Sequence, residues 1–325
     1  MASTWRKTSE DLTSAADMNA KKHFTCSNCG IQADAAKGTE RAKRLLCKNC
    51  FGKREDKREN RLNNLTGSEW ASLSKSVEQY DGTRSEKQRI HGAAFPQSLA
   101  EAHIKVYTKK DDLVLDPFLG VGTTTDAARA LGRRSVGIEL NPEFAALAAN
   151  NSSESDQHKI ICGNALDLSA HIPGESVDFI LTSPPYATLL KNIKGKFGYK
   201  WREHSNLTVQ VNPAPYSRHH EDLGNLAYAD FMEAIESVQR QCYRALKNSC
   251  YSVWVVKDYR DLKASVPYVN FHGDIIRASE AAGFTLWDIK IYDQTKFRPL
   301  VVLGYPSRNY YLNIGHSYIL IFRKY

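Results

Sequence analysis

Apolar and polar positions follow two rhythms along most of the chain, and together they predict alternating strands and helices. Short apolar runs bounded by turn residues are typical of buried strands, and they occur at 113–117, 135–140, 159–165, 177–185, 251–258, 285–292 and 317–323. Helical periodicity predicts helices at 98–107, 124–131, 142–150, 228–247 and 273–282. Trp70, Leu73 and Val77 also fall at helical spacing, which predicts the start of a further amphipathic helix.

This alternation predicts the fold class. Strands that read as continuous apolar runs are buried on both faces, and strand–helix alternation is typical of parallel sheets. We therefore expect an α/β domain at 65–325, with a Rossmann-like sheet of the seven strands above and helices on both faces. Such sheets bind ligands at the carboxyl ends of their strands, so the residues just after each strand are the candidates for chemistry.

The first 64 residues lack this alternation and predict a separate small module. Residues 1–22 are polar and aperiodic, which indicates a mobile tail. Two Cys-x2-Cys pairs follow, separated by 17 residues, and they comprise Cys26, Cys29, Cys47 and Cys50. This spacing is typical of structural zinc sites, in which four thiolates form a closed tetrahedron. We therefore predict a zinc-ribbon-like module and linker at 23–64 that bind Zn²⁺, with redox-active thiols as the alternative.

Composition narrows the class of protein. The 325 residues are 42% apolar with a mean hydropathy of −0.47. No segment approaches the ~18 consecutive apolar residues of a membrane helix, and the N-terminus lacks the apolar core of a secretion signal. Seven cysteines, an odd number, argue against a disulfide framework. We expect a cytoplasmic protein, nucleoid-associated if bacterial, without a membrane partner.

Positive charge is concentrated at the N-terminus. Residues 1–63 hold 14 Lys and Arg against 8 Asp and Glu, which accounts for +6 of the net charge of +8. This distribution predicts a polyanionic partner that the small module approaches, and solvated surface charge is the alternative. For the module itself, DNA contact and protein docking stay open.

A glycine loop follows the first strand of the alternating region. The segment LDPFLGVGTTT places Gly120 and Gly122 at a strand-to-helix turn, where glycine lets the backbone approach a ligand closely. Glu139 ends the next strand, nineteen residues after Gly120, where a carboxylate can accept both hydrogen bonds of a ribose. Thr125 stands where a dinucleotide loop needs its third glycine. The loop predicts a nucleoside-containing cofactor other than a dinucleotide, with a tight turn that binds nothing as the alternative.

The fourth strand ends in Ser183-Pro184-Pro185-Tyr186. The prolines stop the strand and fix its exit. The Ser183 hydroxyl and the Pro184 carbonyl are acceptors for the two hydrogens of a planar NH₂ group, whose lone pair then becomes available for attack. Tyr186 offers a flat face on which a base can stack. The alternative is a rigid strand exit without chemistry.

These segments resemble the DNA methyltransferase family that modifies cytosine N4 or adenine N6, over roughly residues 66–325. Phe118-x-Gly120-x-Gly122 resembles its Phe-x-Gly-x-Gly loop, and HGAAFP at 91–96 resembles its His-Pro-Ala-x-Phe-Pro segment. The resemblance implies S-adenosylmethionine as the cofactor. The cofactor-binding residues that it implies are Phe95, Asp116, Pro117, Phe118, Gly120, Gly122, Thr123, Glu139 and Asn164. Asn164 stands where the family usually has an acid that contacts the adenine amine.

The resemblance further implies that Ser183, Pro184, Pro185 and Tyr186 are catalytic and act on a base flipped out of double-stranded DNA. Serine in the first of these positions usually marks N4-cytosine enzymes, whereas adenine enzymes usually carry Asp or Asn. We therefore expect N4-cytosine methylation, with N6-adenine methylation second. A cognate restriction endonuclease is a candidate partner. A non-catalytic DNA-binding protein of the same fold stays possible, and so does methylation of RNA or of a protein amide.

Residues 187–225 interrupt the strand–helix alternation directly after this tetrad. They interleave cations with aromatic residues, namely Lys191, Lys194, Lys196, Lys200, Arg202 and Arg218 with Phe197, Tyr199 and Trp201. Cations suit phosphates and aromatic rings suit bases, so the segment predicts an insertion that recognises the DNA target. Its end, 222–225, resembles a segment common after the tetrad in this family. A solvated surface loop is the alternative.

Overall fold

The chain forms two compact units, Met1–Arg61 and Leu62–Tyr325, whereas the sequence pattern predicts the boundary after residue 64. The computed structural model describes residues 21–55, 61–149, 157–186, 222–261, 265–297, 306 and 308–325. Within these ranges, no helix combines the length and the apolar character needed to cross a membrane.

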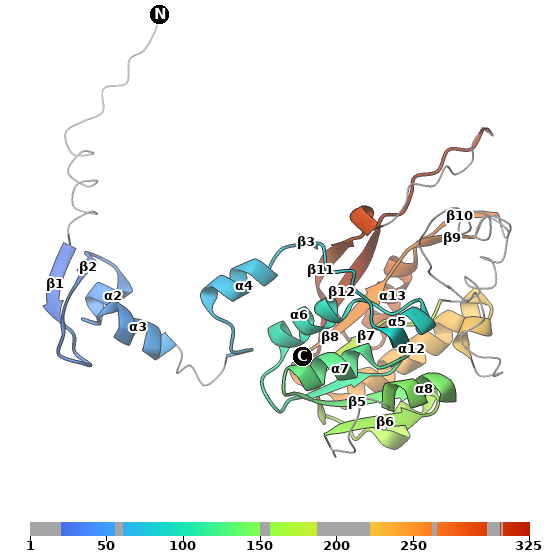
Figure 1. Ribbon diagram of the computed structural model, residues 1–325, viewed down its shortest axis with the longest axis horizontal. Helices are drawn as coiled ribbons and strands as arrows, with labels where there is room; N and C mark the ends of the chain where they lie inside the picture. Colours follow the sequence, from blue (N-terminus) through green and yellow to red (C-terminus); the bar gives the residue numbers. More distant parts are fainter. Residues whose placement is uncertain are drawn as a thin grey trace, which may run out of the picture. The chain divides into compact units, whose positions relative to one another are not determined.

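The smaller unit is a β-hairpin followed by two helices (Figure 1). Strand β1 (Lys21–Thr25) pairs antiparallel with β2 (Gln32–Ala36), and α2 (Glu40–Lys43) and α3 (Lys48–Glu55) follow. Leu46 between the helices is completely buried. Lys21 and Lys22 do not belong to the predicted tail but to β1, because they pair with Ala36 and Ala35.

The larger unit is built on a sheet with the strand order β3-β11-β12-β8-β7-β4-β5-β6 (Figure 1). The seven predicted strands are present as β4 (Leu113–Asp116), β5 (Arg134–Glu139), β6 (His158–Cys162), β7 (Val177–Thr182), β8 (Leu246–Val256), β11 (Thr285–Asp293) and β12 (His316–Arg323). An eighth strand, β3 (Val77–Glu78), pairs parallel with β11. The prediction of a helix through Val77 is therefore wrong, since α4 (Gly67–Leu73) ends before it.

The sheet is mixed, whereas the strand–helix alternation predicts a parallel sheet. Neighbouring strands from β8 to β6 run parallel, but β12 runs antiparallel to both β8 and β11. Among the described residues between β11 and β12 there is no α-helix. Antiparallel neighbours need no helical crossover, so the antiparallel pairing of β11 with β12 agrees with the described part of this connection.

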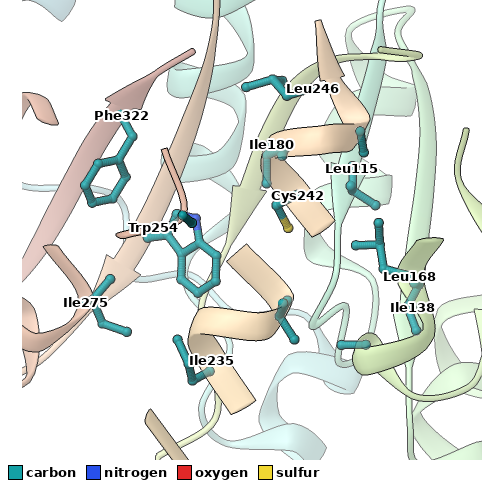
Figure 2. Packing of buried hydrophobic residues seen from close by; sticks show 14 of the residues in the cluster. Leu115, Ile138, Leu168, Ile180, Ile235, Cys242, Leu246, Trp254, Ile275 and Phe322 are labelled. Carbon is teal, nitrogen blue, oxygen red and sulfur yellow. The ribbon is translucent and has the colours of Figure 1, made fainter. Parts of the chain in front are cut away.

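Alternate residues of each central strand point to opposite faces of the sheet. One face packs Val114, Phe179, Val253 and Ile319 against α6 (Gln97–Tyr107) and α7 (Thr123–Ala130). The other face packs against α9 (Leu168–His171), α12 (Tyr228–Ala245) and α13 (Phe271–Ala281). Figure 2 shows this second layer, in which the labelled residues include Leu115, Ile180 and Trp254 of the sheet with Ile235, Cys242 and Ile275 of the helices.

The strand order reverses beside β4, which determines where a ligand can bind. After β4 the chain adds β5 and β6 on one side, and it then returns to add β7 and β8 on the other side. Parallel α/β sheets bind ligands in the crevice that such a reversal opens at the carboxyl ends of the strands. In this protein those ends are Asp116 of β4 and Thr182 of β7, which lie on adjacent strands.

Candidate functional site

A pocket lies at this reversal point and encloses about 900 Å³ when the space open to solvent is included. Of the residues predicted to bind the cofactor or to act in catalysis, its walls contain Phe95, Asp116, Pro117, Phe118, Gly120, Thr123, Glu139, Asn164, Ser183, Pro184, Pro185 and Tyr186. Gly122 is the one predicted residue of that set that does not line it.

The two glycines of the loop are needed for different reasons. Gly120 has a φ of +56°, and a Cβ there would lie 3.0 Å from Nε2 of His91. Gly122 has a φ of +85° and precedes α7, and its Cβ would lie 2.9 Å from the Cβ of Ala148 in α8 (Pro142–Ala149). Gly120 therefore shapes the pocket wall, whereas Gly122 allows two helices to approach each other closely.

Glu139 lies half-buried at the end of β5 with its carboxylate fixed. Its Oε2 accepts a hydrogen bond from the backbone N–H of Gly120 at 2.7 Å, and its Oε1 accepts one from the backbone N–H of Asn141 at 2.8 Å. Burial raises the pKa of Glu139 to about 7. Each carboxylate oxygen has a second lone pair, so the group keeps the capacity to accept further hydrogen bonds from a ligand in the pocket.

Asp116 connects three elements around the pocket. It is 2% exposed, its Oδ2 accepts from the Thr124 hydroxyl at 2.6 Å, and its Oδ1 accepts from the Thr182 hydroxyl at 2.6 Å. The backbone N–H of Phe118 also donates to Oδ1, at 3.1 Å. Burial raises the pKa of Asp116 to about 6, although these donors favour the ionised form. Asp116 lines the pocket as predicted, but its carboxylate chiefly holds the ends of β4, α7 and β7 together.

The Ser-Pro-Pro-Tyr segment leaves the sheet directly beside this network. Strand β7 ends at Thr182, earlier than predicted, since the prolines cannot continue the ladder. Ser183 is half-buried in the pocket wall. The ring of Tyr186 packs 5.4 Å from the ring of Phe271 and 6.1 Å from that of Tyr259, so its orientation is supported from α13 and from β9 (Tyr259–Asp261).

Asn164 and Asp222 both cap short 3-10 helices at the pocket. Oδ1 of Asn164 accepts from the backbone N–H of Leu166 at 3.0 Å, so the oxygen expected to meet an adenine amine already has one protein donor. Oδ1 of Asp222 accepts from the backbone N–H of Gly224 at 2.9 Å, and Asp222 is 4% exposed. The sequence predicts no role for Asp222 itself, although the residue belongs to the segment that resembles the family after the tetrad.

Two further residues, Gln88 behind the pocket wall and His91 within it, support the pocket. Gln88 is 3% exposed, and its Nε2 donates to the Phe95 carbonyl at 3.1 Å and to the Thr123 hydroxyl at 3.0 Å. It thereby joins the segment around Phe95 to the start of α7. The ring of His91 lies 4.8 Å from that of Phe144, and burial lowers the pKa of His91 to about 4. The resemblance of HGAAFP was the available signal for His91, whereas Gln88 carried none.

The structure describes only the end of the predicted target-recognition insertion. Residues 187–221 of the insertion, which include its six named cations and three named aromatic residues, lie outside the described residues. The described end of the insertion forms a 3-10 helix, Leu223–Asn225, and Leu223 lines the pocket. A role of the insertion in target recognition stays a prediction.

Four cysteines meet in the smaller unit. Cys26 and Cys29 lie in the β1–β2 turn, while Cys47 precedes α3 and Cys50 lies within it. Their sulfur atoms all lie within 4.8 Å of one another, and those of Cys29 and Cys47 are 3.7 Å apart. Zinc–sulfur bonds of ~2.3 Å in a tetrahedron separate the sulfurs by about 3.8 Å. The donor set therefore fits a zinc ion.

Comparisons with known proteins identify the family of the chain. Residues 7–150 and 177–325 match the model of a family described as DNA methylase, and residues 115–186 match that of a methyltransferase domain. The chain is 40% identical over 90 residues to the type II methyltransferase M.BglI of Bacillus subtilis. This aligned segment covers 27% of this chain and 25% of M.BglI. It is 37% identical over 93 residues to the type II methyltransferase M.PvuII of Proteus hauseri, covering 26% and 28%.

These alignments span only about a quarter of the length of each relative. Among solved structures, TrmN from Thermus thermophilus superposes with a TM-score of 0.43 at 15% identity, covering 74% of this chain and 52% of that chain.

Proposed function

The chain belongs to the DNA methylase family, and we propose that it transfers a methyl group from S-adenosylmethionine to N4 of cytosine in double-stranded DNA. The observation that carries this proposal is the placement of Ser183, Gly120 and Glu139 around one pocket. A tetrad that can polarise an NH₂ group and a carboxylate that can bind a ribose thus face the same space.

The residues present fit the cofactor. Glu139 provides fixed acceptor oxygens for the ribose hydroxyls, and Phe95 and Phe118 provide apolar walls. Asn164 would face the adenine end through its side-chain amide. When bound, S-adenosylmethionine supplies an electrophilic methyl group.

The residues of the tetrad then position and activate the base. The Ser183 hydroxyl and the Pro184 carbonyl accept hydrogen bonds from the exocyclic NH₂, and Tyr186 stacks on the ring. The fixed exit of β7, with Thr182 bonded to Asp116, holds these acceptors in place. Positioning of this kind can lower the activation free energy by several kcal/mol, whereas flipping the base out of the duplex costs only a few kcal/mol.

Mass spectrometry of nucleosides from treated DNA tests the proposal. We expect N4-methylcytosine from the unmodified protein and a loss of about 10²-fold or more in Ser183→Ala, by analogy with the removal of one preorganised catalytic hydrogen bond. Ser169→Ala is the matched control, because the Ser169 hydroxyl is buried and has no hydrogen-bond partner among the described residues. If the product is N6-methyladenine, the target base is adenine and not the proposed cytosine. Equal rates of methyl transfer for Ser183→Ala and Ser169→Ala would refute the role of Ser183.

We also propose that the four cysteines of the smaller unit bind one structural Zn²⁺. The side-chain N–H of Asn28 donates to the Cys50 sulfur at 3.3 Å, and the backbone N–H of Cys50 donates to the Cys47 sulfur at 3.4 Å. Such donors favour thiolates, the form in which cysteine binds zinc. A cognate restriction endonuclease stays a predicted partner.

A further inference from the structure

A surface of cations and exposed aromatic rings lies at the same edge of the sheet as the pocket. Strands β8 and β11 end at this edge and β12 begins there, since Val256 pairs with Tyr318 and Asp293 pairs with His316. The hairpin of β9 and β10 (Val266–Val269) follows β8, and a 3-10 helix, Thr295–Phe297, follows β11. We call this the edge surface, and its residues are Arg260, Tyr268, Lys296, Phe297, Arg308 and Tyr310.

Three aromatic side chains of the edge surface are exposed to solvent. Tyr310 is 85% exposed, Phe297 49% and Tyr268 41%. Exposed apolar groups mark an interaction surface where they gather in one region with polar residues around them. Each ring offers a face to which a nucleic-acid base or sugar can stack.

The charge of the edge surface favours an anionic partner. The described residues between 257 and 272, between 293 and 297, and between 308 and 316 include four Lys or Arg and three Asp. One of the three acids, Asp258, is completely buried and accepts hydrogen bonds from the Tyr268 hydroxyl at 2.6 Å and from the backbone N–H of His272 at 2.9 Å. The exposed charge is therefore mainly positive.

Arg260 is held in place before any partner arrives. Its guanidinium donates to the carbonyls of Pro267 at 2.7 Å and Leu312 at 2.9 Å. The same group lies 5.5 Å from the ring centre of Tyr268 and 5.2 Å from that of Tyr311. A cation fixed between rings loses little conformational entropy on binding, so it suits repeated contact with a phosphate or a base.

The edge surface adjoins the tetrad. Tyr259, the residue before Arg260, packs against Tyr186, which we propose as the stacking partner of the flipped base. On the basis of that proposed function, we infer that the edge surface binds the DNA substrate beside the extruded base, with cations on phosphates and rings on bases or sugars.

DNA binding by variants of the full chain tests this inference. Fluorescence anisotropy with a labelled duplex should show about 5- to 100-fold weaker binding for Tyr310→Ala, the range expected when one stacked base loses its ring. In the double variant Lys296→Ala and Arg308→Ala, log K of DNA binding should depend less on the salt concentration. The slope of log K against log salt concentration should become shallower by about 0.9 for each phosphate contact removed. Binding of S-adenosylmethionine should not change in either variant.

Matched controls lie at the opposite edge of the sheet. Tyr325, 63% exposed, follows the end of β12, and the exposed Lys110 precedes β4. Tyr325→Ala and Lys110→Ala should bind DNA as the unmodified protein does. DNA affinity equal to that of the unmodified protein in all edge-surface variants would overturn the inference, while methylation by the unmodified protein would leave the proposed function standing.

The converse outcome is also distinguishable. If the edge-surface variants lose DNA affinity but Ser183→Ala methylates normally, the surface stands and the assigned role of the tetrad fails. An unmodified protein that does not bind duplex DNA would overturn both.

Discussion

Replacing Thr182 by valine removes one hydroxyl from the buried network that joins the catalytic strand exit to the cofactor loop. Thr182 is completely buried, and its hydroxyl donates at 2.6 Å to a carboxylate of Asp116 that is itself 2% exposed. Valine keeps the shape of the side chain. Because a hydrogen bond to a charged group contributes about 1.5–3 kcal/mol, we expect the free energy of unfolding to fall by that amount at pH 8.

The same substitution should also show a defined pH dependence. The Thr182 hydroxyl favours the ionised form of Asp116, whose pKa burial raises to about 6. The stabilisation by Thr182 is therefore fully present above this pKa and shrinks as the pH falls through it, when Asp116 takes up a proton. The cost of Thr182→Val should be smaller at pH 5 than at pH 8. Methyl transfer should fall as well, because Ser183 is the next residue.

Urea unfolding of the full chain at the two pH values measures these effects. Thr125→Val is the matched control, since Thr125 is 1% exposed and its hydroxyl has no hydrogen-bond partner within the described part of the chain. Thr124→Val, which removes the donor to the other oxygen of Asp116, should be coupled to Thr182→Val by about 0.5–3 kcal/mol. Equal costs for Thr182→Val and Thr125→Val at pH 8 would refute the reasoning.

Three further predictions concern the cofactor site, the cysteines and the glycine loop. Calorimetry should show S-adenosylmethionine binding weakening as the pH falls through about 7, because protonation of Glu139 removes acceptor capacity, and Glu139→Gln should abolish this dependence. Metal analysis should find about one Zn²⁺ per chain, lost in Cys26→Ser but kept in Cys162→Ser, whose exposed thiol lies outside the cluster. Gly122→Ala should lower the free energy of unfolding by roughly 1–2 kcal/mol or more, measured in urea, because of its positive φ and the approach of Ala148; an unchanged value would contradict that explanation.

The sequence alone determined the features that depend on local spacing. Periodicity located the seven main strands, and residue types at strand ends located the glycine loop, Glu139 and the tetrad. The spacing of the cysteine pairs was sufficient to predict that their sulfurs meet. These features could be predicted because neighbouring residues in the chain impose them, through backbone geometry and the burial of one face.

Only the tertiary structure decided which distant segments meet. The direction of β12 and the pairing of β3 with β11 depend on which apolar faces are buried together, and the apolar pattern of a strand is the same for either direction. The hydrogen bond between Thr182 and Asp116 joins residues that are 66 positions apart in the chain, and the one between Gln88 and Thr123 joins residues 35 positions apart. Such contacts form because packing the helices and the sheet brings these polar groups together in a buried space where each needs a partner. Local sequence does not specify which partner that will be.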